Sequence, residues 1–347
     1  MKRSFLLAVF IIAFVGVVAF LVLRQKPESN SASVTPVPSK PTRESVSLRF
    51  PIPLVESGQA SFYLAQDKGF YAEENLDVKF EMGSKELNPV KMVVSGTDTF
   101  GLLGGPDTLL VARSTGAPLK AVAIIHRNSN FPCIITKKDS GLTKVEQLAG
   151  KQVGFYYGHI STDVLRNLFR RTNTTVTEVD VGFDYAQFIQ GKIDASWAFT
   201  VTAGFDLPAK GVELNFISPA DYGIVTHGYT IFASDETVAE KPDVVRRFLK
   251  ASLRGVQAAV ADPEAANQSL LKRGPQLDAA LNLKRQKAYN AVTSNSAEFP
   301  AGYMDREMFQ TTYTRLAEEK VLKKEFDPAD AYTTRFLEEI HGAPFKK

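Results

Sequence analysis

The segment VSLRFPIPLVESGQASFYLAQDKGFYAEENLDVKFEM, residues 46–82, carries the pattern from which the fold class is predicted. Val46, Leu48 and Phe50 alternate with polar residues, a period of two that is typical of a half-buried strand. A helix is predicted from 61 to 70, and the same alternation returns from 76 to 82. A strand, a helix and a second strand in this order predict a parallel pair joined by a crossover helix.

The same alternation continues along the rest of the chain. Further strands are predicted at 100–103, 121–125, 133–136, 152–155, 176–181, 195–199, 212–217 and 229–232, with helices at 89–94, 106–114, 145–148, 161–171 and 185–190. The last part is predicted to be mainly helical, with a helix that starts at Pro242 and others at 263–273, 277–294, 305–319 and 328–340. We therefore expect an α/β protein whose two lobes enclose a ligand cleft outside the carboxyl ends of the strands.

The charges are distributed unevenly along the 347 residues. The whole chain carries a formal charge of +3, but the first 41 residues hold five of the 41 basic residues and one of the 38 acidic residues. The remainder has 36 basic and 37 acidic residues. A body so close to neutral argues against a nucleic-acid-binding protein that works by neutralising phosphates.

The N-terminal region predicts a membrane anchor followed by a linker. Lys2 and Arg3 precede 19 uncharged, mostly apolar residues, 5–23, a length at the upper limit for a signal peptide and close to that of a spanning helix. We assign 1–23 to a signal-anchor or signal peptide, with retention favoured over cleavage. Serine and proline dominate the following segment, so 24–45 is predicted to be a flexible linker.

Motifs of the common catalytic and metal sites are missing. The chain contains no GxSxG elbow, no Walker A sequence, no GxGxxG and no HExxH, and its four histidines have no metal-ligand spacing. The single cysteine, Cys133, excludes an intrachain disulfide and a cysteine-ligated zinc or iron–sulfur centre. These observations favour a binding protein over an enzyme, without a cofactor or a metal.

Four segments at predicted strand ends combine aromatic and small polar residues, and they supply the candidate ligand-binding residues. The candidates are Glu56, Ser57 and Gln59 with Tyr63; Gly105 and Asp107; Tyr156, Tyr157, Ser161 and Thr162; and Trp197, Phe199 and Thr200, to which His227 is added. Glycine allows close approach of a ligand to the backbone, and a helix N-terminus suits a polar or anionic group.

Each candidate also has a purely structural interpretation. Tyr63 and Trp197 are large enough to belong to a core, and Asp107 suits a helix cap. Tyr156 and Tyr157 point to opposite sides if the chain is extended, so at most one of them faces the cleft. Ser161 and Thr162 are typical N-cap residues, and an isolated histidine such as His227 is more often structural.

Six segments, in order along the chain, resemble the motifs of one family. They are YLAQDKGFYAEENLDV (63–78), VSGTDTFG (94–101), LAGKQVG (148–154), GKIDA (191–195), SPADYG (218–223) and PDVVRRFLKA (242–251). The family is that of the substrate-binding proteins of ABC importers of the sulfonate, nitrate and thiamine-precursor group, also called SsuA/THI5-like or NMT1-like.

This resemblance implies a type II periplasmic-binding-protein fold, with lobe one at 46–128 plus 228–347 and lobe two at 129–227. It implies an extracytoplasmic, monomeric protein that closes on a small ligand and delivers it to an ABC permease with a cytoplasmic ATPase. In the thiamine-precursor branch a flat pyrimidine is held between aromatic rings. Tyr63, Tyr156 or Tyr157, Trp197 and Phe199 would serve that purpose here.

The resemblance leaves alternatives open. A sulfonate or nitrate would need donors, for which Ser57, Ser161, Thr162 and His227 are candidates, but the four segments contain no Arg or Lys. Their absence favours a heteroaromatic ligand of the pyrimidine or thiamine-precursor type. The related pyrimidine-precursor synthases carry a cysteine-rich motif that this chain lacks, which disfavours an enzyme. A tethered sensor is a further alternative.

Overall fold

The computed structural model describes residues 43–84, 86–157 and 160–345. The predicted anchor, 1–23, and almost all of the predicted linker, 24–45, lie outside these residues. In the described part of the chain, no helix has both the length and the apolar character that a membrane span requires. The anchor and linker therefore stay predictions.

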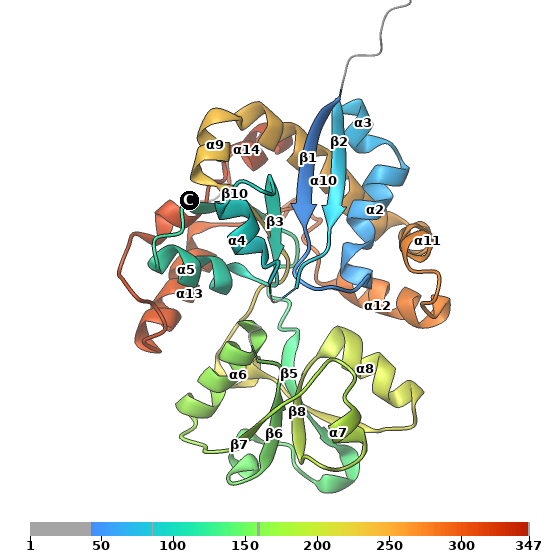
Figure 1. Ribbon diagram of the computed structural model, residues 1–347, viewed down its shortest axis with the longest axis vertical. Helices are drawn as coiled ribbons and strands as arrows, with labels where there is room; N and C mark the ends of the chain where they lie inside the picture. The colour runs from blue at the N-terminus through green and yellow to red at the C-terminus, as the bar shows by residue number, and fades with distance from the viewer. Residues whose placement is uncertain (1–42, 85, 158–159, 346–347) are drawn as a thin grey trace, which may run out of the picture. The chain divides into compact units, whose positions relative to one another are not determined.

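The first sheet has five strands in the order β2-β1-β3-β10-β4 (Figure 1). Its strands are β1 (Glu44–Arg49), β2 (Leu76–Glu81), β3 (Phe100–Leu103), β4 (Leu119–Ile124) and β10 (Thr230–Ser234). β1 pairs in parallel with β2, as the opening segment predicts, and also with β3. β10 runs antiparallel to both β3 and β4 and lies between them. The last strand along the chain, β10, thus lies in the interior of the first sheet and not at its edge.

The second sheet also has five strands, in the order β7-β6-β8-β5-β9. Its strands are β5 (Pro132–Lys137), β6 (Gln152–Phe155), β7 (Thr177–Asp180), β8 (Ala195–Phe199) and β9 (Leu214–Ile217). β6 is parallel to β7 and β8, whereas β5 runs antiparallel to β8 and β9. All five strands come from one continuous stretch, residues 132–217, so no strand from elsewhere in the described chain takes part in this sheet. The lobe boundaries at 128/129 and 227/228 stay a prediction.

Helices flank both sheets, and five of those described, α4, α9, α11, α12 and α13, begin at a side-chain cap. They are α2 (Ala60–Asp67), α3 (Phe70–Glu73), α4 (Pro89–Val94), α5 (Pro106–Ser114), α6 (Ile160–Arg171), α7 (Ala186–Ile189), α8 (Thr200–Ala209), α9 (Asp235–Glu240), α10 (Pro242–Ala261), α11 (Pro263–Arg273), α12 (Ala279–Ala291), α13 (Arg306–Glu318) and α14 (Arg335–His341). Short 3-10 turns are η1 (Ser57–Gln59), η2 (Lys138–Ser140), η3 (Val145–Leu148), η4 (Pro219–Tyr222) and η5 (Pro328–Ala331). Asp262, Asp278 and Asp305 each accept a backbone N–H in the first turn of the helix that follows.

One predicted helix is wrong, and one helix of the structure was not predicted. The helix expected at 328–340 is divided into η5 and α14, because the backbone is extended at Tyr332 (φ −150°, ψ 168°). There the next amide, that of Thr333, donates to the carbonyl of Ala121, and the ring of Tyr332 stacks on Phe309 with centroids 4.3 Å apart. Residues 200–209, for which no element was predicted, form α8.

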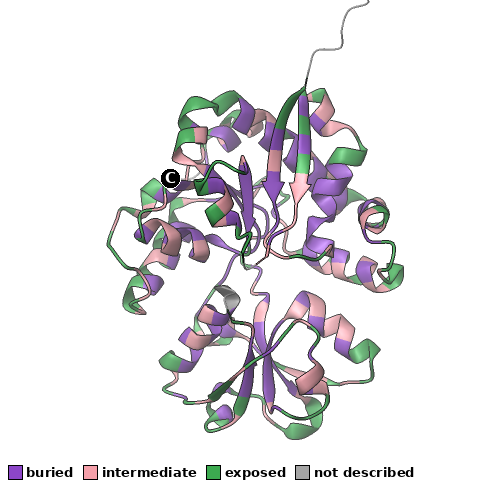
Figure 2. Ribbon diagram, in the orientation of Figure 1, coloured by how far each residue is buried: buried purple, intermediate pink, exposed green. Residues whose placement is uncertain are grey.

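Each sheet has its own hydrophobic core, and Figure 2 shows the strands mainly buried and the outer helix faces exposed. In the first core, Phe100 of β3 stacks on Phe248 of α10 with ring centroids 4.0 Å apart. In the second core, Trp197 of β8 is completely buried. A third, small cluster of Phe131, Val201 and Tyr289 lies where the first connection between the sheets meets α8 and α12.

Two chain segments, 125–131 and 218–229, connect the sheets, and we call them the crossing segments. They are hydrogen-bonded to each other: the amide of Asn130 donates to the carbonyl of Thr226 at 3.3 Å, and the amide of Thr226 donates to Oδ1 of Asn130 at 2.9 Å. Asn128 and Asn130 have positive φ values of 49° and 48°, a conformation that asparagine tolerates better than most residues. These contacts hold the two crossings side by side.

Candidate functional site

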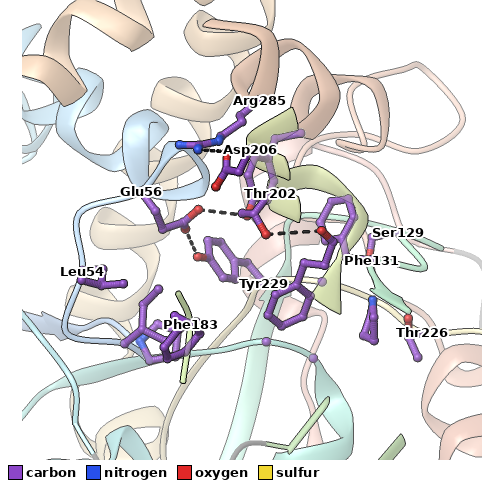
Figure 3. Close-up of a pocket in the computed structure, with 18 of the residues that line it drawn as sticks. Leu54, Glu56, Ser129, Phe131, Phe183, Thr202, Asp206, Thr226, Tyr229 and Arg285 are labelled. Atoms are coloured by element: carbon purple, nitrogen blue, oxygen red, sulfur yellow. Dashed lines mark hydrogen bonds and ion pairs between the residues drawn. The ribbon is translucent and has the colours of Figure 1, made fainter. Parts of the chain in front are cut away.

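A pocket of about 290 Å³ lies beside the crossing segments, and its lining comes from elements around both sheets. Residues 51–56 follow β1, Gly104 and Gly105 follow β3, and Phe199 ends β8. The carboxyl ends of parallel strands therefore meet at this pocket, which is where an open α/β sheet binds its ligand. Figure 3 shows the side chains around it.

Glu56 holds the most elaborate polar contact in the pocket. Its carboxylate accepts hydrogen bonds from the hydroxyl of Tyr289 at 2.9 Å, from the amide of Gly58 at 3.1 Å and from the hydroxyl of Tyr229. Burial, and then the negative charge of Glu56, raise the pKa of both tyrosines well above 10. Both hydroxyls therefore stay protonated and act as donors, which fixes the carboxylate in place.

A second charged pair faces the same part of the pocket. Arg285 of α12 donates to Asp206 of α8, and its guanidinium also reaches Oδ1 of Asn282 at 2.8 Å. This pair joins α8, which connects β8 and β9 of the second sheet, to α12 of the C-terminal region (Figure 3). Because Asp206 already neutralises Arg285, the pair leaves no excess positive charge in the pocket.

Aromatic side chains form the apolar wall. Phe131, Phe183 and Phe199 line the pocket. Behind them lies Trp197, whose ring centroid is 5.4 Å from that of Phe183 and 5.3 Å from that of Phe199. Aromatic faces of this kind suit a flat ring, because stacking buries area without requiring charge.

Polar residues gather at the crossing segments, away from Glu56. Ser129, Thr226 and His227 line the pocket there, together with Asp107 at the start of α5. Asp107 forms a buried ion pair with Arg315 of α13, and Nδ1 of His227 accepts the amide of Asn128 at 3.1 Å. Burial lowers the pKa of His227 from 6.5 to about 4, so the imidazole is neutral near pH 7.

Five of the candidate residues that the sequence suggested are found in the wall of this pocket, and their role in binding stays a prediction. They are Glu56, Gly105, Asp107, Phe199 and His227. Gly105 is needed there for space, since a Cβ atom on it would lie 2.6 Å from the carbonyl oxygen of His227.

The other candidates lie elsewhere. Tyr63 and Trp197 are buried in the first and second core, respectively. Gln59 accepts a hydrogen bond from the hydroxyl of Tyr63. The hydroxyl of Ser57 donates to Oδ1 of Asn282 at 3.1 Å, and that of Thr162 donates to the carbonyl of Tyr156. Tyr156 packs on Phe183 and Trp197, the exposed ring of Tyr157 faces Arg166, and Thr200 opens α8. The side chain of Ser161 lies outside the described part.

The structure weakens the case for the predicted anion donors. The hydroxyls of Ser57 and Thr162 are already committed to protein acceptors, and a neutral His227 carries no charge to attract an anion. In the described ranges no group of three or more His, Cys, Asp or Glu side chains is arranged to hold a metal ion. The candidate site is therefore best suited to an uncharged, flat ligand.

Sequence reasoning missed several lining residues because they come from distant segments. Arg285 and Tyr289 lie on one face of α12, four residues apart, and both reach the pocket. That spacing was visible in the sequence, but nothing local indicated that this helix would lie against η1. Phe183 and Asp206 belong to a loop and to the unpredicted α8.

Two α/β sheets, two crossing segments and a pocket beside them define a periplasmic-binding-protein fold. Among solved structures, the periplasmic aliphatic sulphonate binding protein SsuA of Escherichia coli has this fold, with a TM-score of 0.66 and 16% identity, over 83% of this chain and 91% of that chain. The sequence model of the family described as "NMT1/THI5 like" matches residues 57–266, and the chain belongs to this family. The family expected from the six sequence segments is thereby confirmed.

Curated relatives cover most of the chain. The riboflavin-binding protein RibY of Chloroflexus aurantiacus is 26% identical over 90% of this chain and 92% of its own length. The formylaminopyrimidine-binding protein of Halalkalibacterium halodurans is 26% identical over 69% of this chain and 74% of its own length. The 4-amino-5-hydroxymethyl-2-methylpyrimidine phosphate synthase THI13 of Saccharomyces cerevisiae is 28% identical over 67% of this chain and 73% of its own length.

Proposed function

We propose that this protein is an extracytoplasmic solute-binding protein of an ABC importer. In this role it closes on a small heteroaromatic ligand of the pyrimidine or thiamine-precursor type and delivers the ligand to a permease. It acts as a receptor and not as an enzyme, and the apolar run at 5–23 tethers it to the cytoplasmic membrane. Two relatives are named for binding a flavin and a pyrimidine, which supports a ligand with a flat heteroaromatic ring.

The observation that carries the proposal is the environment of Glu56. A carboxylate fixed by two tyrosine hydroxyls at an aromatic-walled pocket accepts hydrogen bonds from ring N–H or amino groups of a heteroaromatic solute. It repels an anion. The cation that lines this pocket in the described residues, Arg285, is paired with Asp206. Sulfonate or nitrate binding, the first alternative, would need an unpaired cation in this position.

The second alternative is a synthase like THI13. The sequence offers one cysteine, Cys133, which is completely buried, and burial raises the pKa of its thiol far above the ordinary value. A thiol in that state is a poor nucleophile and a poor metal ligand. A receptor function is therefore better supported than a synthase function.

Calorimetric titration of the full chain, purified in detergent, tests the proposal. The panel contains an aminopyrimidine, a formylaminopyrimidine, riboflavin, an alkanesulfonate and nitrate. We expect saturable binding of at least one heteroaromatic compound, a ligand-dependent rise in melting temperature and unchanged ligand after prolonged incubation. Tight binding of the sulfonate or nitrate alone, or conversion of a bound pyrimidine precursor, would overturn it.

A further inference from the structure

The crossing segments place four polar groups at one end of the pocket, and we call this end the crossing subsite. Its members are Ser129, Thr226, His227 and Asp107. The hydrogen bonds between Asn130 and Thr226 fix the two segments side by side. Figure 3 shows Ser129 and Thr226 near each other, on the far side of Phe131 from Glu56.

Two hydroxyls of the crossing subsite are buried without a partner. Ser129 is 8% exposed and Thr226 is 3% exposed, and neither hydroxyl oxygen has a hydrogen-bond partner among the described residues. Buried hydroxyls are normally hydrogen-bonded, because removing them from water unpaired is unfavourable. Both line the pocket, so a ligand group placed there would satisfy them.

The remaining two groups supply one donor and one acceptor. Because Nδ1 of His227 accepts the amide of Asn128, the proton of the neutral ring sits on Nε2, which is left to donate. Asp107 uses one carboxylate oxygen for Arg315 and is an acceptor. Two hydroxyls, one N–H and one carboxylate thus form a mixed set of donors and acceptors.

This mixture distinguishes between the polar groups that a ligand could present. A phosphate requires donors and positive charge, but Arg315 is shared by Asp107 and Glu319, and Arg127 of the first crossing segment does not line the pocket, so no spare cation lines the subsite in the described residues. Aliphatic hydroxyls, which donate and accept at once, match every member of the set. Several such hydroxyls on one chain would engage more than one member together.

We propose that the crossing subsite binds an uncharged, polyhydroxylated side chain attached to the ring of the ligand. The inference rests on the proposed function, in which the aromatic wall and Glu56 hold the ring. The ligand is then a heteroaromatic solute with a polyol arm, oriented with its ring toward Glu56 and its hydroxyls toward the crossing segments. A ring that lacks the arm fills only part of the pocket.

Flavins provide matched probes for this proposal. Riboflavin carries a polyol arm, lumiflavin has the same ring with a methyl group instead, and riboflavin 5′-phosphate adds a charge at the end of the arm. In calorimetry with the full chain we expect riboflavin to bind at least about tenfold more tightly than lumiflavin, since two net hydrogen bonds are worth about that factor. The phosphate ester is expected to bind about tenfold more weakly than riboflavin.

Variants assign the preference to the subsite. Ser129→Ala combined with Thr226→Val should lower riboflavin affinity about tenfold and leave lumiflavin affinity unchanged, so that the ratio of the two approaches one. Ser196→Ala is the matched control, because this hydroxyl is also buried and without a partner among the described residues but does not line the pocket. Circular dichroism and melting temperature verify that each variant is folded.

The outcomes separate this inference from the proposed function. Equal affinity for riboflavin and lumiflavin, tighter binding of the phosphate ester, or equal loss of both flavins in the double variant would overturn the polyol subsite and leave the receptor intact. Binding of an aminopyrimidine without any flavin would have the same meaning. If no heteroaromatic compound binds at all, the proposed function itself fails.

Discussion

The hydroxyl of Tyr289 donates a 2.9 Å hydrogen bond to Oε2 of Glu56, although 233 residues separate them in the chain. The contact joins α12 to the loop after β1, directly at the pocket. Tyr229 donates to the other oxygen of the same carboxylate. A charge held by donors from three chain segments keeps one orientation, which is what selective recognition of a ligand requires.

Replacing Glu56 by Gln should therefore weaken ligand binding by about tenfold or more. The amide removes the charge and offers a single acceptor oxygen to two tyrosine donors, and charge-assisted hydrogen bonds are worth about 1.5–3 kcal/mol. Calorimetric titration with the best ligand from the panel measures the loss. Glu240→Gln, at an exposed position on α9, serves as control. Unchanged affinity in Glu56→Gln would show that this carboxylate takes no part in ligand binding.

The aromatic wall is expected to matter more for binding than the tryptophan behind it. Phe183→Ala removes a lining ring and should weaken binding about tenfold, because a stacked aromatic contact and its buried area are lost. Trp197→Phe should bind within about threefold of the unmodified protein, since Trp197 touches Phe183 and Phe199 but does not line the pocket. Stopped-flow or equilibrium titration of both variants decides the matter. A larger loss in Trp197→Phe than in Phe183→Ala would contradict it.

The ion pair between Asp107 and Arg315 should contribute strongly to stability when only one partner is removed. Both side chains are almost completely buried, so Arg315→Met leaves Asp107 and Glu319 without a shared cation. We expect the free energy of unfolding to fall by about 3–5 kcal/mol, measured by urea denaturation. Arg246→Met, which breaks an exposed pair with Asp243, should cost less than about 1 kcal/mol. Similar losses in the two variants would show that burial does not matter here.

Acid should destabilise the protein through His227. Its folded-state pKa of about 4 lies below the ordinary value of 6.5, so between these pH values the unfolded chain binds a proton that the folded protein does not. The free energy of unfolding attributable to this residue therefore falls as pH drops from 6.5 to 4, by about 3 kcal/mol in total. Four charged groups surround this histidine: two are negative, Asp107 and Asp305, and two are positive, Arg127 and Arg315.

Denaturation at pH 7 and pH 5 checks the histidine prediction. His227→Gln should lose less stability between the two pH values than the unmodified protein does. Some acid sensitivity is expected to remain, because burial also lowers the pKa of His126, to about 3. A pH dependence that is identical in the variant would show that His227 is not the group responsible.

Much of the fold was predictable from local pattern. The helix beginning at Pro242 was expected from a proline at its first position and from a stripe that includes Val245, Phe248 and Leu249, and all three are buried in α10. Helix α8 was missed because it contains Gly204 and Pro208, which are unfavourable in a helix and obscure its pattern. Its position is determined by tertiary contacts instead of by propensity.

The site was only partly predictable, for a different reason. The sequence locates where strands end, and Glu56, Asp107 and Phe199 do reach the pocket from such positions. It does not determine which of several aromatic rings faces the cavity. Trp197 and Phe199 are two residues apart on one strand, yet only Phe199 lines the pocket, because the ring of Trp197 is enclosed by its neighbours in the second core.

The interior position of β10 has a consequence for the order in which the two sheets can form as the chain is delivered from its N-terminus. β10 separates β3 from β4, so the first sheet stays divided until residues 230–234 have emerged. By then every strand of the second sheet has been made, since the last of them, β9, ends at Ile217. The second sheet can therefore be completed before the first sheet, although its strands begin later in the chain. Until β10 is in place, the strands within residues 44–124 have unpaired edges, which favour pairing with other chains.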